Sequence, residues 1–556
     1  MFLKAVKMVI SWLLVLAIIV SAGPTGAFAA PEDSSFIIIE EALPLQQKIA
    51  PSLRESFAGE DYVEALVKLT RQVDTVKVAR AELKNAPSLH QGRSRAREAV
   101  VDMLRENAST SQAPILRYLE QEQSKGNVLE YEGYYIVNLV YVKATAAVIE
   151  QLARRADVKV IMPNEFIELD WPGIATPAED APAVQWAWGV TRVKAPDVWD
   201  LGYDGTGVVV GIMDTGVAWQ HEALKEKWRG YNPASPGNPS ADYNWFDPVY
   251  GTSLPVDIDG HGTHVTGTVA GSTADELIGV APGAQWIAVN IFTIGQDGKP
   301  GAYSDDIIAG AEFMLAPTDI NGNNPRPDLA PDIINNSWGG GSGLDEWFRY
   351  CVQAWRSAGI LPVFAAGNEG RRGAGTVSSV SAYPESFAVA AIDFDENLAD
   401  FSSRGPGPYP GYLNQKPDIS APGVNIRSSV PTGYANYQGT SMAAPHVSGV
   451  AALVLSANPD LSPEELAQIL KETAKPLADA NYPDTPNYGY GYGLVHALAA
   501  VQKARCGVIT GRVLAPGVDE EAPEISHQQE VTFLYQGYGF PLEATVEDNV
   551  GVTSVK

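Results

Sequence analysis

The apolar positions of the chain fall into one long run and several short ones. Residues 442–457 contain no Asp, Glu, Lys or Arg. A segment of that length is too long for a strand and too apolar on every side for a surface helix, so it predicts a buried helix. Apolar runs typical of buried strands alternate with two further helical patterns; the runs are 208–213, 286–292, 333–335, 361–365 and 387–393, and the helical patterns are 302–315 and 343–358. This alternation predicts an α/β fold with a doubly wound parallel sheet.

A different pattern precedes this region. Strand-like and helical segments follow one another in the order strand, helix, two strands, helix, strand; they are 62–69, a charged zone reaching about residue 123, two runs within 128–143, 144–155 and 158–163. The pattern predicts a small ferredoxin-like α+β domain at about 60–168. A binding or protein-interaction module of the same architecture stays open as an alternative.

The N-terminal segment 1–29 has the features of a signal peptide. Lys4 and Lys7 precede an uncharged apolar stretch, and Ala27-Phe28-Ala29 is a small-x-small cleavage pattern. Glycine and proline interrupt the apolar stretch before that pattern, so we expect export and no transmembrane anchor. The mature protein is then expected to be secreted, extracellular or associated with the cell wall.

Composition narrows the function classes. A chain of 556 residues is long enough for several domains, and its formal net charge of −27 disfavours a nucleic-acid partner. Cys351 and Cys506 are the only cysteines, so no disulfide framework holds the fold. The sequence does not decide whether these two cysteines pair.

Ser441 lies at the start of the predicted buried helix. Free backbone N–H groups and the positive end of the helix dipole favour an alkoxide or oxyanion at that position. Pro445 also fits there, because the first turn needs no N–H from it. A lone serine at this place is most often an ordinary helix cap. A nucleophilic role needs a base and an acid elsewhere in the chain.

Two candidates occur upstream. Asp214 ends the predicted strand 208–213, at the carboxyl edge where open α/β sheets hold their sites. His261 opens a small-residue segment with the glycines that close packing requires. Taken alone, Asp214 is a turn carboxylate, and His261 is a helix cap or half of a metal pair with His264.

Three motifs in this order resemble those of the subtilisin-like serine peptidases: Asp-Thr-Gly at 214–216, His-Gly-Thr-His at 261–264 and Gly-Thr-Ser-Met-Ala-Ala-Pro at 439–445. The resemblance implies a serine endopeptidase that acts on proteins or peptides through an Asp214–His261–Ser441 triad. It further implies that the Asn368 side chain and the Ser441 N–H hold the oxyanion. Asn368 taken alone is a turn residue.

The same resemblance implies a substrate-binding edge and pocket. The residues that it assigns there are Ser337, Trp338, Gly339, Gly340, Ala365, Ala366 and Gly367. Trp338 could equally belong to the core. No cofactor is expected for the chemistry.

The resemblance also divides the chain. It implies a propeptide at 30–170 that inhibits its own peptidase, a processing linker at 171–184 and a catalytic domain at 185–504. Residues 507–556 have left the peptidase pattern and resemble the first strands of a β-sandwich. We therefore expect an incomplete accessory domain there, and a longer natural protein.

The sequence leaves open whether the protein binds a metal ion and whether it is catalytically active. Ala223 stands where the family's best-known calcium site has an acid, so that site is in doubt. The polar insertions 228–254 and 318–332 are predicted to be surface loops near the substrate face that offer structural calcium another site. Asp257 and Asp259 are predicted to be solvated. A catalytically inactive scaffold that binds protein is the alternative function.

Overall fold

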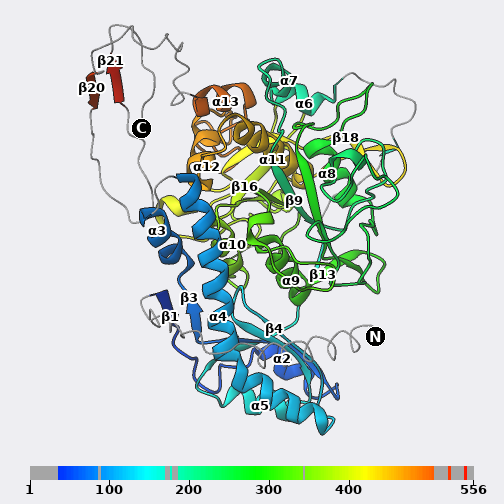
Figure 1. Cartoon of the computed structure of the whole chain (residues 1–556), viewed down its shortest axis with the longest axis vertical. Coiled ribbons are helices and arrows are strands. Elements are labelled where there is room, and N and C mark those ends of the chain that lie inside the picture. Colours follow the sequence, from blue (N-terminus) through cyan, green and yellow to red (C-terminus); the bar gives the residue numbers. More distant parts are fainter. Residues whose placement is uncertain are drawn as a thin grey trace, which may run out of the picture.

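A computed structural model describes residues 36–85, 89–169, 176–177, 186–341, 343, 345–505, 524–527 and 544–547. Figure 1 shows a small N-terminal domain below a larger α/β domain, with the long helix α4 (Leu89–Ser124) running beside both. The signal-peptide prediction for 1–29, Cys506 and most of the linker 171–184 lie outside the described residues.

The larger domain is built on a seven-stranded parallel sheet, which confirms the predicted fold class. Its strands, in spatial order, are β10 (Trp245–Phe246), β11 (Gln285–Asn290), β9 (Val209–Asp214), β14 (Ile333–Asn336), β15 (Leu361–Ala365), β16 (Phe387–Ile392) and β17 (Ile419–Pro422). The chain turns to one side of β9 first and then to the other. The strand order therefore reverses between β9 and β14, where open sheets form their crevice.

Alternate residues of the strands supply two hydrophobic cores. Val210 and Ile212 of β9 join the core beneath α8 (His261–Ala270), α11 (Thr440–Ala457), α12 (Pro463–Glu472) and α13 (Ala497–Arg505). Met213 joins the opposite core, beneath α9 (Ser304–Leu315) and α10 (Arg349–Ser357). Both faces of the sheet are covered by helices, which is why its strands read as continuous apolar runs.

The predicted long buried helix is α11, and its residues from Thr440 to Leu455 are buried. It is also, among the described residues, a helix long and apolar enough to cross a membrane, but 89% of its apolar window is buried inside the protein. Helix α10 begins six residues later than the predicted start at 343. Residues 302–303 were predicted to be helical but end a short strand, β13 (Pro300–Tyr303), and helix α9 starts after them.

The insertion 228–254 is a surface loop only in part: residues 232–238 are exposed, as predicted, but its two tryptophans are not. Trp228 and Trp245 are fully buried, and Trp228 stacks on Trp286 of β11 with ring centroids 5.9 Å apart. Trp245 also begins β10, the edge strand of the large sheet. Trp228 and Trp245 do not belong to a periodic pattern of apolar residues, so the sequence did not reveal that they are buried. The second insertion packs against the first, since Tyr243 N–H donates to the Thr318 carbonyl at 2.8 Å.

The small domain is ferredoxin-like, as predicted. Four antiparallel strands lie in the order β4-β5-β2-β6, with bounds β2 (Val63–Leu69), β4 (Val128–Tyr134), β5 (Leu139–Ala144) and β6 (Val158–Pro163). Ala65 and Val67 face a core shared with α5 (Ala146–Ala153) and the C-terminal part of α4. Leu66, on the opposite face, joins the core of the larger domain beneath α9 and α10. Both faces of this sheet are therefore buried.

Further short strands lie outside the two main sheets. Strand β7 (Phe166–Glu168) leaves the small domain and pairs with β13 of the larger one. Strand β8 (Thr176–Pro177) pairs with β19 (Tyr434–Tyr437). Within the C-terminal extension, β20 (Glu524–His527) and β21 (Ala544–Glu547) pair with each other; the rest of 507–556 lies outside the described residues.

Candidate active site

Asp214 and His261 meet at the carboxyl edge of the large sheet. Asp214 is the last residue of β9 and His261 the first of α8, and the distance between Asp214 Oδ1 and His261 Nδ1 is 2.7 Å. Both side chains are buried, at 1% and 0% exposure. Because a carboxylate can only accept, Nδ1 carries the proton, and Nε2 of the neutral ring is left as the basic nitrogen.

The surroundings of His261 favour its protonated form. Burial alone would lower its pKa, but the Asp214 charge and hydrogen bond, with smaller contributions from Asp259 and Asp257, raise that pKa above its ordinary value. A raised pKa strengthens the ring as a proton acceptor once it is neutral.

Asp257 fixes the turn that precedes α8, and it is not the solvated side chain that was predicted. Its carboxylate accepts hydrogen bonds from the Thr215 hydroxyl at 2.8 Å, from both N–H and hydroxyl of Thr263, and from the N–H of Gly260. Thr215 in turn accepts from the Gly262 N–H at 2.9 Å. These contacts tie the start of α8 to the end of β9, and so hold His261 against Asp214. Asp259 is exposed, as predicted.

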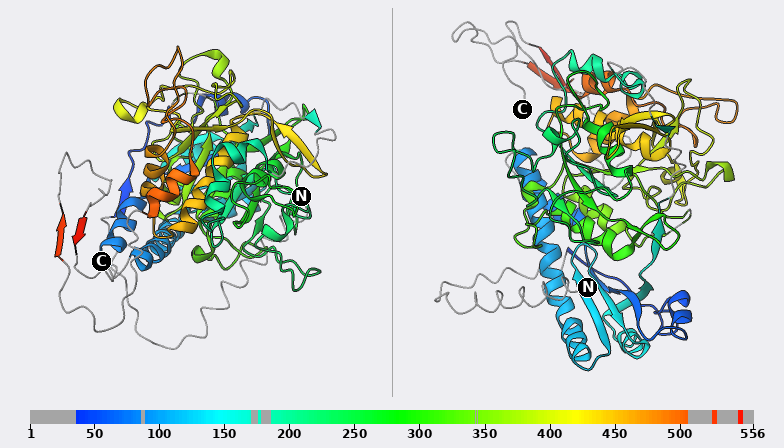
Figure 2. Two further views of the ribbon diagram at one scale, coloured as in Figure 1. Left: turned by 90° about the horizontal axis from the view of Figure 1, so that it is seen from above. Right: turned by 90° about the vertical axis from the view of Figure 1, so that its right-hand side faces the viewer.

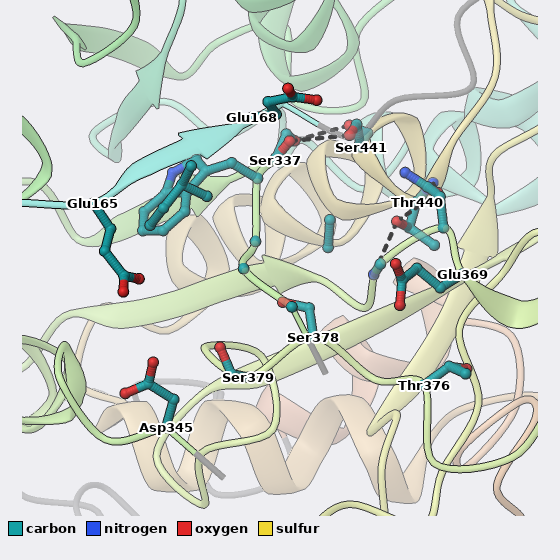
Figure 3. Close-up of a pocket in the computed structure, with 18 of the residues that line it drawn as sticks. Glu165, Glu168, Ser337, Asp345, Glu369, Thr376, Ser378, Ser379, Thr440 and Ser441 are labelled. Atoms are coloured by element: carbon teal, nitrogen blue, oxygen red, sulfur yellow. Dashed lines mark hydrogen bonds between the residues drawn. The ribbon is translucent and has the colours of Figure 1, made fainter. Parts of the chain in front are cut away.

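Ser441 lies in the first turn of α11 and faces the loop that follows β14. Its hydroxyl donates to the Ser337 carbonyl at 3.0 Å, and the Ser337 hydroxyl donates to the Ser441 carbonyl at 2.8 Å (Figure 3). Ser441 is not the cap, because Gly439 occupies that position, and Pro445 lies within the helix rather than in its first turn. The N-termini of α8 and α11 both lie at the carboxyl edge of the sheet, since His261 contacts the last residue of β9 and Ser441 contacts the residue after β14.

Asn368 is oriented by the residue before Ser441. Its Oδ1 accepts from the Thr440 N–H at 2.9 Å and from the Thr440 hydroxyl at 3.0 Å. With the amide oxygen turned to Thr440, the amide NH2 group is directed away from it. Asn368 and Ser441 both line one cavity.

This cavity has a volume of about 320 Å³. The predicted substrate-binding residues that line it are Ser337, Trp338, Gly339, Gly340, Ala365 and Gly367. Ala366 does not line it; its backbone N–H instead donates to Val389 of β16 at 3.0 Å. Trp338 lines the cavity and also belongs to the core, where its ring meets Phe348 and Phe364 edge-on.

Comparison with known proteins identifies the family. The sequence profile described as "Subtilase family" matches residues 205–493, more than half of the chain. The chain belongs to the subtilase family. The named relatives include bacillopeptidase F of Bacillus subtilis (strain 168), which is 46% identical over 93% of this chain and 37% of its own length. The chain thus spans little more than a third of that relative.

Shorter relatives match as well. M-protease of Shouchella clausii (strain KSM-K16) is 34% identical over 70% of this chain and 89% of its own length. Subtilisin E of Bacillus subtilis (strain 168) is 33% identical over 69% of this chain and 87% of its own length. The chain is therefore similar both to a relative that extends far beyond the matched part and to relatives that are matched over most of their own length.

The small domain of this subtilase reaches the cavity through β7. Residues 165–168 line the cavity, and Ala302 and Gly301 of β13 are paired with Ile167 and Glu168. Gly301 has no side chain where the Phe166 ring lies, since an added Cβ would be 2.2 Å from that ring. Figure 3 draws Glu165 and Glu168 among the side chains that line the cavity. Strand β7 therefore occupies the edge of β13 and also lines the cavity.

Several residues of the site escaped sequence reasoning. Thr440 is part of a recognised motif, but its contact with Asn368 depends on a fold that brings distant segments together. Asn335 donates to the Ser337 hydroxyl at 2.9 Å and accepts from the Ser448 hydroxyl at 2.8 Å. The adjacent polar residues at the end of β14 were the available signal, because buried polar side chains need partners.

The metal hypotheses find no support among the described residues. No cluster of three or more His, Cys, Asp or Glu side chains in the described ranges could hold an ion. His264, the other half of the considered metal pair, donates from Nε2 to the Ile426 carbonyl at 2.9 Å and stacks on Tyr437. Glu276, in the loop where the family's calcium site was doubted, forms an ion pair with Arg427 at 2.6 Å.

Proposed function

We propose that this chain is a serine endopeptidase that hydrolyses peptide bonds of proteins through an acyl-enzyme on Ser441. His261 takes the hydroxyl proton of Ser441 as the serine attacks the substrate carbonyl, and then gives it to the leaving amine. Asp214 holds the ring in the required tautomer and stabilises its positive charge. Water then attacks the ester with His261 again as the base.

The observation that carries this proposal is the buried 2.7 Å contact between His261 and Asp214, with Ser441 on the neighbouring helix N-terminus. The hydroxyl of Ser441 donates to Ser337 in this structure. It has to turn from Ser337 toward His261 when substrate binds; such tightening on binding is common in hydrolases.

We assign oxyanion stabilisation to Asn368 and the backbone N–H of Ser441. The Asn368 amide is held by Thr440, so its donor is in place before the reaction and need not reorganise. The Ser441 N–H is one of the free donors at the start of α11. Together they form a two-donor site beside the nucleophile.

We further propose that the enzyme is made as an exported zymogen. Residues 1–29 direct export, and the mature enzyme works outside the cell or at its wall. Residues 30–170 act as propeptide and inhibitor, because β7 already occupies the edge β13 where a peptide substrate would pair. The linker 171–184 is the site of processing, and Thr176 and Pro177 within it pair with β19.

One comparison tests both parts. The wild-type chain and Ser441→Ala are expressed in parallel, and casein hydrolysis and the size and N-terminal sequence of the secreted product are measured. We expect the wild type to be cut within 171–184. Ser441→Ala should stay uncut and lose about six decades of turnover, the size of the loss known for subtilisin.

Two outcomes would contradict the proposal. Substantial casein hydrolysis by Ser441→Ala would exclude Ser441 as nucleophile. A wild-type protein that is folded yet fully inactive after removal of the small domain would favour the inactive scaffold instead. An active enzyme that begins at Ala30 or Pro31 would end the propeptide assignment.

A further inference from the structure

Helix α4 is longer than the small domain needs. Its 36 residues extend about 54 Å, whereas the seven-residue strands beneath it extend only about 23 Å. Ile115 and Leu119, in its C-terminal part, pack on the four-stranded sheet. The remaining N-terminal part continues past the sheet and along the catalytic domain, and two views at right angles agree on this (Figures 1 and 2).

That projecting part forms a hairpin with α3 (Thr75–Asn85), and the hairpin packs on α10. Val78 of α3 and Val100 of α4 are at most 4% exposed and belong to the same hydrophobic cluster as Val352 and Trp355 of α10. The hairpin therefore shares a continuous apolar core with the catalytic domain rather than touching it through polar side chains alone. Burial of this kind is the main source of interface stability.

Arg97 anchors the hairpin to two carbonyls of the catalytic domain. Its Nε donates to the Ala358 carbonyl at 2.9 Å and its Nη1 to the Ala330 carbonyl at 3.3 Å. Ala358 caps the C-terminus of α10, and Ala330 ends the short helix η3 (Pro327–Leu329). Carbonyls at helix ends lack intrahelical donors and carry partial negative charge, so a guanidinium suits them.

The charge of Arg97 is compensated nearby. Burial lowers the pKa of Arg97, and the carboxylates of Asp332 and Asp328 offset part of that effect. The same end of α10 carries a second contact, since the Ser357 hydroxyl donates to the Thr75 hydroxyl of α3 at 3.0 Å. Hydrogen bonds from a charged donor are about twice as strong as neutral ones, so the Arg97 contacts outweigh the neutral contact between Ser357 and Thr75 at this end of α10.

We propose that the α3–α4 hairpin and the surface of α10 and η3 form a second propeptide-binding interface that holds the propeptide after the linker is cut. None of the residues that Arg97 or Thr75 contacts lines the cavity, so a cut in the linker leaves these contacts intact. Cleavage and release are then separate steps, and the hairpin sets the rate of the second. This inference rests on the proposed function only in that it takes residues 30–170 to be a propeptide.

The test measures dissociation without requiring hydrolysis. The full chain carries Ser441→Ala and a recognition sequence for a site-specific protease within 171–184. After the cut, the fraction of small domain still bound to the catalytic domain is followed over time by size-exclusion chromatography. We expect Arg97→Met to dissociate about tenfold faster or more, because two charge-assisted hydrogen bonds are lost.

Arg95→Met is the matched control. Arg95 lies on the same helix and is exposed, so its substitution removes one positive charge without removing a contact to α10 or η3, and we expect the parent rate. Arg97→Lys keeps the charge but not the planar fork, and should give an intermediate rate. That variant decides the question if Arg97→Met does not fold.

Equal dissociation rates for Arg97→Met and Arg95→Met would overturn the proposal, and so would immediate dissociation of the parent chain after the cut. Because the readout is association, a failure of Ser441 as nucleophile would leave this result unaffected. The two proposals can therefore fail separately.

Discussion

The Ser337 hydroxyl donates a 2.8 Å hydrogen bond to the Ser441 carbonyl, which is the carbonyl that Pro445 leaves without an intrahelical donor. In an α-helix the N–H of residue 445 would reach the carbonyl of residue 441, but proline has no N–H. The residue that follows β14 thus supplies the donor missing from α11. Helix and sheet are joined at the residue proposed as the nucleophile.

Ser337→Ala should therefore destabilise the protein more than the loss of a surface hydroxyl would. It leaves the buried Ser441 carbonyl without a donor, and we expect a loss of about 1–3 kcal/mol in the free energy of unfolding, together with a lower kcat. Chemical denaturation and steady-state kinetics of the variant measure the two effects. Pro445→Ala provides the matched background, because alanine restores the intrahelical donor. A cost of Ser337→Ala that is equal in both backgrounds would show that the carbonyl is not the reason for it.

Asn368→Leu should lower kcat by about two to three decades while KM changes little. The expected size, about 2.7–4 kcal/mol of transition-state stabilisation, is that measured for the corresponding side-chain donor in subtilisin. The amide donor acts chiefly on the developing oxyanion, which is why KM is spared. Thr440→Val keeps the volume of Thr440 but removes the hydroxyl that holds the Asn368 amide, so a smaller loss of kcat is expected. A loss that falls mainly on KM would remove Asn368 from the oxyanion role.

Local patterns predicted much of this fold, and their failures have physical causes. The apolar runs that became β9, β14 and β15 are buried on both faces and so need no alternation to be recognised. Strand β17 was missed because its four residues include serine and proline. The buried part of the insertion 228–254 was missed because it depends on Trp228, which stacks on Trp286, and on Trp245, which begins the edge strand β10.

The sequence motifs likewise identified only part of the candidate site. Asp214, His261 and Ser441 could be selected from their motifs, and the 2.7 Å contact of the first two required the structure. Asp257 was misjudged because a carboxylate in a glycine-containing turn is usually solvated, whereas here the fold brings Thr215 and Thr263 to it. Hydrogen-bond partners that are distant in the chain leave no trace in a local pattern.

The pH dependence of activity should respond to Asp259. His261 acts as a base only when neutral, so kcat/KM should fall as the pH falls through its raised pKa. Asp259→Asn removes one of the charges that raise this pKa and should move the acid limb of the profile to lower pH. Because Asp259 is exposed, the shift should shrink at high salt. Asp275→Asn is the control, since it removes the same charge from an exposed position that does not act on His261. Identical profiles for wild type and Asp259→Asn would refute this electrostatic coupling.

Release of the small domain should be faster at alkaline pH because of Glu312. This residue of α9 accepts backbone hydrogen bonds from Tyr135 and, at 2.9 Å, from Ile136, at the turn between β4 and β5. Burial raises the pKa of Glu312 to about 8, although both N–H groups and Arg105 act in the opposite direction; Glu132 adds to the increase. In the separated catalytic domain this face of α9 is open to water, and the carboxyl returns to its ordinary pKa. The docked state therefore binds the proton more tightly than the separated state does.

Deprotonation of Glu312 therefore weakens docking of the small domain as the pH rises. Docking is strongest below the ordinary pKa of a glutamate, weakens as the pH rises toward about 8, and changes no further above that value. In the Ser441→Ala chain cut within its linker, dissociation should thus accelerate between about pH 5 and about pH 9. Glu312→Gln keeps an oxygen that accepts both N–H groups but no longer titrates, so its rate should be nearly the same at both pH values. Glu120→Gln, at an exposed position of α4, should retain the dependence of the parent chain. If Glu312→Gln accelerates with pH as strongly as Glu120→Gln does, some other group controls release and the buried carboxyl is only an acceptor.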